Sequence, residues 1–194
     1  MSLKFECRKC SKTYNIDSKS YKCECGGLFK LNITKKNIKN DLTLGEGDTP
    51  TLKKKFHSKN VYFKLDYIQP TASFKDRGAV ILIDQLKKYG IKKIVEDSSG
   101  NAGSSIAAYA AAADIECSIF LPAKTSESKI KEIRAHGAEV IKIEGDRDAT
   151  SKAVLKAAEN NYYASHVYNP LFFAGTSSLA YEIAKNPGIP DKVF

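Results

Sequence analysis

The chain has 194 residues, of which 42% are hydrophobic and 27% are charged, and its formal net charge is +9. This is enough apolar material for a folded core and fits one or two domains. No apolar run is long enough to span a membrane and no secretory signal is present, so we expect a cytoplasmic protein with no membrane partner. The lysines are spread along the chain without interleaved aromatic residues, so we expect no nucleic-acid partner.

Residues 1–34 read as a unit of their own, because they hold two pairs of cysteines. Cys7 and Cys10 form the first pair, and Cys23 and Cys25 follow after twelve residues. Two knuckles of this kind bring four thiolates into a tetrahedron around zinc, and so short a segment needs a metal to fold. Structural zinc is therefore favoured, while disulfides or a redox pair are the alternatives. The Cys-x-Cys spacing of the second pair is less typical than Cys-x-x-Cys.

Residues 35–60 read as a polar, lysine-rich connector, and residues 61–194 alternate between short apolar strands and helices. This alternation predicts an α/β fold, with a mostly parallel sheet and helices on both faces. Strands are expected at 61–65, 93–95, 117–121, 139–143, 162–164 and 192–194, and helices at 76–89, 102–113, 126–136, 148–160 and 174–185.

The stretch from residue 71 to residue 78 places a lysine in a restrained position. Pro70 stops the preceding strand, and Thr71 and Ser73 are suited to cap a helix, so Lys75 is expected near a helix start at the end of a buried strand. Burial and the positive end of a helix both favour a neutral amine, which is the nucleophilic form. On this stretch alone, a solvated lysine at a turn is the simpler interpretation.

A second stretch, residues 96–103, predicts an anion site. Val95 ends an apolar strand, and a loop of small residues then leads into an alanine-rich helix. Free backbone N–H groups at a helix N-terminus bind anions, and Asn101 adds a side-chain amide. Because strand ends of a parallel sheet meet at one edge, we expect Lys75 and this loop to line a shared cleft.

Residues 71–78 and 98–103, in this order and spacing, resemble the fold type II enzymes that use pyridoxal phosphate (PLP), and within them the threonine synthases. Residues 45–50 and 169–183 resemble further segments of that family. The resemblance implies that Lys75 binds the cofactor and is the catalytic base, and that Asn101 contacts the cofactor ring oxygen. It implies a tryptophan synthase beta-like fold behind a zinc ribbon. It also implies that the substrate carboxylate is held by Ser98, Ser99, Gly100, Asn101 and Ala102.

The function implied by the resemblance is that of a lyase in threonine biosynthesis. Such an enzyme converts a small amino-acid substrate, O-phospho-L-homoserine, and water into L-threonine and phosphate, and family members often form homodimers. The family's glycine-rich loop for the PLP phosphate follows a strand that begins near Val193, so the resemblance covers roughly the first half of the enzyme. We therefore expect this chain alone to bind PLP weakly.

Two other functions are kept open by the sequence. One is a different fold type II enzyme, such as a serine or threonine dehydratase or a cysteate synthase-like protein. The other is a non-catalytic zinc-ribbon and α/β fragment that binds a partner.

Three reactive side chains are interpreted as structural. Cys117 lies within an apolar strand and is expected to be buried. His136 closes a helix and is expected to cap it. His166 follows a strand end, where a structural hydrogen bond is favoured over catalysis.

Overall fold

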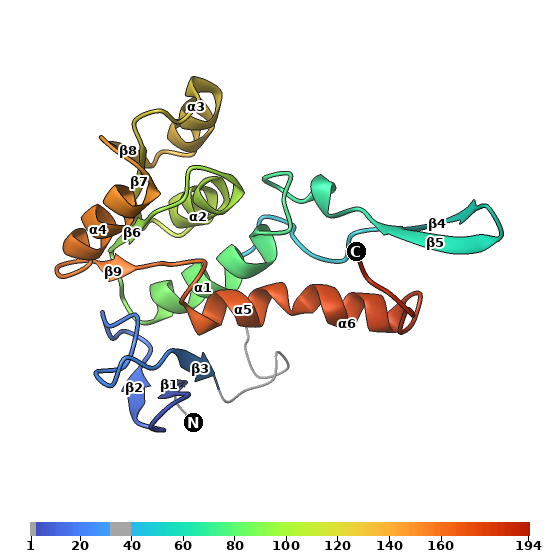
Figure 1. Cartoon of the computed structure of the whole chain (residues 1–194), viewed down its shortest axis with the longest axis horizontal. Coiled ribbons are helices and arrows are strands. Elements are labelled where there is room, and N and C mark those ends of the chain that lie inside the picture. The colour runs from blue at the N-terminus through green and yellow to red at the C-terminus, as the bar shows by residue number, and fades with distance from the viewer. Residues whose placement is uncertain (1–2, 32–39) are drawn as a thin grey trace.

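The structure is a computed structural model that describes residues 3–31 and 40–194. The predicted boundary at residue 34 and the beginning of the predicted connector lie outside these residues. Within them the chain forms three separate sheets, which Figure 1 shows as a small N-terminal sheet, a projecting hairpin and a larger sheet flanked by helices.

The N-terminal sheet is antiparallel and has the order β2-β1-β3. Its strands are β1 (Lys4–Cys7), β2 (Thr13–Asn15) and β3 (Phe29–Leu31). Phe5 and Phe29 are buried and stack with ring centroids 5.6 Å apart. Both belong to the same core cluster as the helices of the main body, so the cysteine-bearing segment packs against that body.

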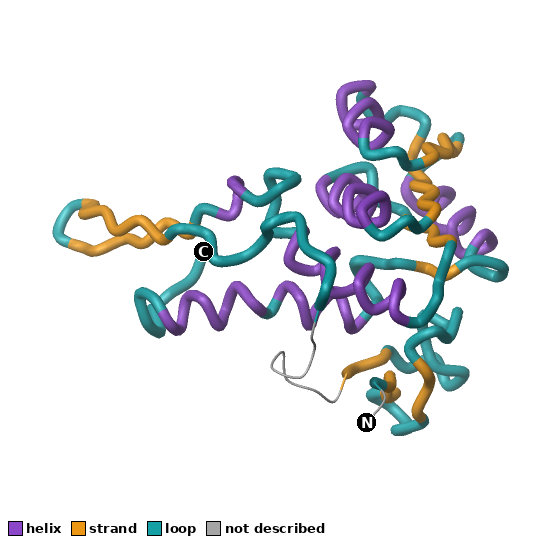
Figure 2. The backbone as a smooth tube through the Cα atoms, turned by 180° about the vertical axis from the view of Figure 1, so that it is seen from behind, coloured by secondary structure: helices purple, strands orange, loops and turns teal. Residues whose placement is uncertain are grey.

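The hairpin consists of β4 (Thr51–Phe56) and β5 (Lys59–Lys64), which pair antiparallel. The strand expected at 61–65 is therefore present, but its assignment to the parallel sheet was wrong. A two-residue turn, in which His57 has φ +52°, folds β5 directly back on β4, and so short a turn joins only antiparallel strands. Figures 1 and 2 show the hairpin projecting from the molecule, and Phe56 is 67% exposed.

The main sheet is parallel, has the order β8-β7-β6-β9, and confirms the predicted fold class. Side chains alternate between its two faces. Ile119 and Leu121 of β7 join the core cluster beneath α2 and α3, whereas Phe120 joins a second cluster with Val154 of α4. Helices thus cover both faces (Figure 1). The elements are β6 (Lys93–Glu96), α2 (Asn101–Ala112), β7 (Glu116–Pro122), α3 (Glu127–Ala135), β8 (Glu139–Ile143), α4 (Arg147–Ala157) and β9 (Tyr162–Tyr163).

Helix α1 (Asp76–Lys88) crosses α5 (Pro170–Thr176) at very close range. A Cβ atom at Gly175 would lie 2.0 Å from the carbonyl oxygen of Arg77, and one at Gly78 would lie 2.6 Å from the ring of Phe172. Both positions therefore require glycine for the two helices to meet.

The C-terminal part of the prediction needs two corrections. The single helix expected at 174–185 is two helices, α5 and α6 (Ser178–Lys185), and the first begins earlier because Asn169 caps it and Pro170 occupies its first turn. The strand expected at 192–194 is a loop, and Val193 is 70% exposed, with no neighbouring strand among the described residues. No helix in the described ranges has the length and apolar character needed to cross a membrane.

Candidate functional site

Lys75 is the residue that precedes the first turn of α1, and it is half-buried. The preceding strand, β5, ends at Lys64 and is mostly exposed, so the expectation of a buried strand end beside Lys75 was wrong. A short 3₁₀ helix, η2 (Asp66–Ile68), and a turn intervene instead. The backbone N–H of Lys75 donates to Ser73 Oγ at 3.2 Å, and its Nζ lies 4.3 Å from the centroid of the Phe74 ring.

The next residue, Asp76, fixes this turn to helix α2. Its carboxylate is fully buried and accepts hydrogen bonds from the backbone N–H of Thr71, at 2.7 Å, and from the Thr71 hydroxyl. It also accepts a bond of 2.5 Å from Ser105 Oγ, which lies one turn after Asn101 on α2. One buried carboxylate therefore ties the lysine turn to the helix that follows the anion loop.

The anion loop, defined here as residues 98–102, connects β6 to the first turn of α2. The backbone N–H groups in the first turn of α2 have no carbonyl four residues earlier in the helix to donate to. They can therefore bind an anion. A Cβ atom at Gly103 would lie 2.1 Å from the carbonyl oxygen of Ser98, so the loop can close this tightly only over a glycine. Ser98 and Ala102 are buried, Ser99 and Gly100 are half-buried, and Asn101 is exposed.

Asp76 of the first motif contacts α2 at Ser105, just after the second motif, so the two stretches are joined through a helix and not at two strand ends. Lys75 and Asn101 stand at the N-termini of the adjoining helices α1 and α2. Only the anion loop follows a strand of the parallel sheet. A further cation lies nearby, because Lys129 Nζ is 4.0 Å from the point that a Cβ atom on Gly100 would occupy. Positive charge and free N–H groups together favour an anionic ligand.

Arg77 forms a buried ion-pair network that the sequence analysis did not identify. Its guanidinium donates to both carboxylate oxygens of Asp66, at 2.7 and 2.9 Å, and to both of Glu182, at 2.5 and 2.9 Å. Lys64 Nζ adds a second cation 2.7 Å from Glu182. Burial acts to raise the pKa of Glu182, but the bonds from Arg77 and Lys64 outweigh it and lower the pKa to about 2. The available indication was that an arginine, Arg77, stands within the 71–78 stretch two residues after Lys75.

Residues 45–50 connect this network to α2. Thr49 Oγ donates to Asp66 at 2.6 Å and accepts from Arg77 at 3.1 Å. Glu46 accepts a bond of 2.8 Å from the hydroxyl of the buried Tyr109 in the middle of α2. The segment that resembles the family therefore braces both helices of the site from outside.

The four N-terminal cysteines form a single cluster. Their sulfur atoms all lie within 4.8 Å of one another, and three pairs, Cys7 with Cys25, Cys10 with Cys23 and Cys10 with Cys25, are 3.5 Å apart. All four are free thiols in the structure. Zinc in a tetrahedron of thiolates, with bonds of about 2.3 Å, places the sulfurs about 3.8 Å apart, so the spacing fits such a centre.

The surroundings favour thiolates at Cys7 and Cys23, whose pKa values are lowered. At Cys10 the backbone N–H of Lys12 acts to lower the pKa, but the neighbouring Cys25, Cys23 and Cys7 outweigh it and raise the pKa to about 12. The backbone N–H of Lys9 points at Cys7 Sγ from 3.3 Å. The Tyr14 hydroxyl lies 3.2 Å from Cys23 Sγ and is the largest of the contacts that lower the pKa of Cys23 to about 6. A Cβ atom at Gly27 would lie 2.5 Å from Cys7 Sγ, so this turn has room only for glycine. The cluster could hold a metal ion with little rearrangement.

The three side chains interpreted as structural have the expected surroundings. Cys117 is buried, and burial raises its pKa to about 12. His136 is the C-terminal cap residue of α3. His166 pairs through Nδ1 with the fully buried carboxylate of Glu96.

Comparison with protein-family models identifies the chain. Residues 42–194 match the model described as pyridoxal-phosphate dependent enzyme. The chain belongs to this family. Its match begins just before the 45–50 segment and includes Lys75, the anion loop and the Arg77 network.

Known proteins similar to this member of the PLP-dependent family include two threonine synthases. That of Methanocaldococcus jannaschii is 30% identical over 97% of this chain and 56% of its own length. That of Bacillus sp. is 38% identical over 74% of this chain and 42% of its own length. A hydrogen sulfide-producing enzyme from Fusobacterium nucleatum has a similar structure, with a TM-score of 0.62 and 29% identity over 72% of this chain and 50% of that one. The chain spans about half the length of the relatives it matches.

Proposed function

We propose that this chain carries the lysine-bearing part of a cytoplasmic threonine synthase, which converts O-phospho-L-homoserine and water into L-threonine and phosphate. The observation that carries the proposal is the bond between Asp76 and Ser105, which ties the turn that bears Lys75 to the helix that follows the anion loop. It is supported by the 30% identity to a threonine synthase over 97% of the chain, a match that extends into the cysteine-bearing segment. Homodimer formation is part of the same proposal.

The roles proposed for the site residues follow from their chemistry. Lys75 binds the cofactor and, as a neutral amine, takes a proton first from the substrate carbon that bears the amino group and then from the next carbon. It returns one proton to the carbon that phosphate leaves and one to the carbon that bears the amino group, while water adds to the carbon between them. PLP, when bound, supplies an electron sink for the charge that develops on those carbons. The Asn101 amide donates to the ring oxygen of the cofactor. The N–H groups of the anion loop hold the substrate carboxylate.

Lys75 and Asn101 suit the aldehyde and the ring oxygen of PLP, but they do not supply donors for its phosphate group. Lys75 is anchored through the turn that Asp76 clamps, and Asn101 is exposed where a ligand can reach it. The dianionic phosphate needs its own group of backbone donors, which the resemblance places after Val193.

We further propose that Cys7, Cys10, Cys23 and Cys25 bind a structural zinc ion. The spacing of their sulfurs, the N–H groups that face them and the lowered pKa of Cys23 support this. Four thiolates leave no open coordination position, so such an ion stabilises the segment and takes no part in the reaction.

A second candidate is another PLP-dependent elimination or replacement enzyme. The similarity in structure to a hydrogen sulfide-producing enzyme, at 29% identity, favours keeping it. The two candidates share the lysine and the anion loop, and they differ in the group that leaves the substrate.

Product analysis at saturating PLP distinguishes them. The proposal expects threonine and phosphate in equal amounts from O-phospho-L-homoserine, lost in Lys75→Ala and kept in Lys87→Ala, an exposed lysine on the same helix. A 2-oxo acid with ammonia from serine or threonine, or sulfide from cysteine, would support the second candidate instead.

A further inference from the structure

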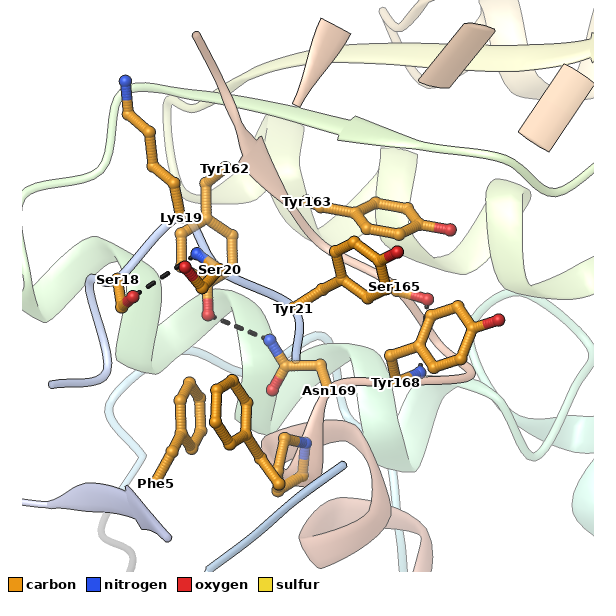
Figure 3. A pocket seen from close by; sticks show the side chains of 12 residues that line it. Phe5, Ser18, Lys19, Ser20, Tyr21, Tyr162, Tyr163, Ser165, Tyr168 and Asn169 are labelled. Atoms are coloured by element: carbon orange, nitrogen blue, oxygen red, sulfur yellow. Dashed lines mark hydrogen bonds between the residues drawn. The ribbon is translucent and has the colours of Figure 1, made fainter. Parts of the chain in front are cut away.

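Three tyrosine rings join the cysteine-bearing segment to the main sheet. Tyr21 stands two residues before Cys23, and its ring centroid lies 5.8 Å from that of Tyr163 in β9 and 5.2 Å from that of Tyr168. Figure 3 shows the three rings together in a crevice that both parts of the chain line. Nearby, Lys19 Nζ donates to the carbonyl oxygen of Asn160 at 2.9 Å and holds the same stretch against the main body.

Tyr163 continues this contact to the anion loop. Its hydroxyl donates to Asp97 Oδ1 at 2.5 Å, and Asp97 directly precedes Ser98. Asp97 is 7% exposed although β6 ends at Glu96, so its side chain is the first anchor beyond the strand. Burial, together with the charges of Glu96 and Asp97, raises the pKa of Tyr163, which keeps the hydroxyl protonated as a donor.

The far end of the loop has a separate anchor. Gly103 packs against the carbonyl oxygen of Ser98, and the backbone N–H of Ser104 donates to the carbonyl oxygen of Gly100 at 3.1 Å. The bond between Ser104 and Gly100 belongs to the first turn of α2, whereas the approach of Gly103 to Ser98 closes the loop back on its entry. The bond between Tyr163 and Asp97 therefore fixes the entry of the loop, while its exit is fixed by the helix.

We propose that Asp97 and Tyr163 are positioning residues that hold the anion loop in its binding shape, and that Tyr21 braces Tyr163 from the cysteine-bearing segment. The inference rests on the proposed role of the loop in holding the substrate carboxylate. It gives the N-terminal segment a part in substrate binding, because the ring of Tyr21 restricts the residue that anchors the loop.

Amide hydrogen exchange of the free protein tests the positioning directly. Tyr163→Phe keeps the ring and removes the bond, so the hydrogen-bonded amides of residues 98–102, such as that of Gly100, which donates to Ser98 Oγ at 3.4 Å, should exchange on the order of tenfold faster. Tyr21→Ala should also speed their exchange, whereas Tyr21→Phe should restore the native rate because the ring contact remains. Tyr62→Phe, on the exposed hairpin, is the matched control and should change nothing in the loop. Amides in α1, whose buried side chains belong to the other core cluster, serve to report global unfolding and should exchange at the native rate in all variants.

The outcomes separate this inference from the proposed function. Native exchange at 98–102 in Tyr163→Phe would overturn the inference, as would equal rates in Tyr21→Ala and Tyr21→Phe. A second arm adds PLP and O-phospho-L-homoserine. Protection of 98–102 in the native chain that weakens in Tyr163→Phe supports both proposals. No protection in the native chain contradicts the proposed role of the loop, while the exchange rates without ligand still decide whether Tyr163 positions it.

Discussion

Arg77 is a buried cation that is stabilised entirely by its partners. Its side chain is 1% exposed and lies between Asp66 and Glu182, which come from opposite sides of α1 in the sequence. A buried charge of this kind contributes to the fold only while it is fully paired, since loss of a partner leaves an uncompensated charge. The network therefore holds the end of the hairpin, α1 and α6 together through ion pairs.

Replacing Arg77 tests this network. Arg77→Ala should lower the free energy of unfolding by about 3–5 kcal/mol, because Asp66 loses its cation and Glu182 is left with Lys64 alone. Urea denaturation of the purified chain measures the change. Arg134→Ala, at an exposed position in the last turn of α3, is the control and should change stability by less than about 0.5 kcal/mol. Similar values for the two variants would show that the network is not stabilising.

The same network predicts a pH dependence. The pKa of Glu182 is lowered from 4.5 to about 2 in the folded chain, so the stabilisation is complete above pH 4.5 and is lost as the pH falls towards 2. Glu182→Gln removes this titration. The difference in stability between the native chain and Glu182→Gln should therefore be large at pH 7 and shrink between pH 4.5 and 2. A difference that stays constant across this range would contradict the assignment.

At the scale of the elements, what the sequence predicts well is set by local signals. The helices at 76–88 and 101–112 follow apolar periodicity and small-residue loops, and the strands β6 to β9 follow short apolar runs. The pairing of β5 with β4 could not be predicted from residues 61–65 alone, because an apolar run indicates a strand without indicating which strand it pairs with. The lysine turn was misplaced for the same reason, since its position depends on the contact between Asp76 and Ser105. The Arg77 network joins residues more than 100 positions apart and leaves no local pattern.

The cysteine cluster is an element whose stability we expect to depend on a metal. Metal analysis should give about one zinc per chain, and Cys23→Ser should abolish binding and loosen the N-terminal sheet. Cys117→Ala is the control, because this thiol lies in β7 outside the cluster, and it should retain the zinc. A metal-free chain with a fully protected N-terminal sheet would contradict the proposal.

At the scale of the whole molecule, the parallel sheet acts as the platform and the other parts brace the site on it. The cysteine-bearing segment contacts the sheet through Tyr21, the 45–50 segment contacts α2 through Glu46, and α5 crosses α1 at Gly175. The contacts of Glu46 and Gly175 end on α2 and α1, and that of Tyr21 reaches the anion loop through the bond between Tyr163 and Asp97. The lysine-rich hairpin β4–β5 projects from this arrangement with Leu52, Phe56 and Phe63 exposed, and Lys64 at its end joins the Arg77 network.

The measurement that most directly tests the central claim is reduction of the chain with borohydride in the presence of PLP, followed by peptide mass mapping. PLP is added at high concentration to offset weak binding. The account predicts a pyridoxyl group mainly on Lys75, lost in Lys75→Ala and retained in Lys87→Ala. Labelling spread evenly over the surface lysines, or centred on another lysine, would contradict the assignment of Lys75 as the cofactor-binding residue.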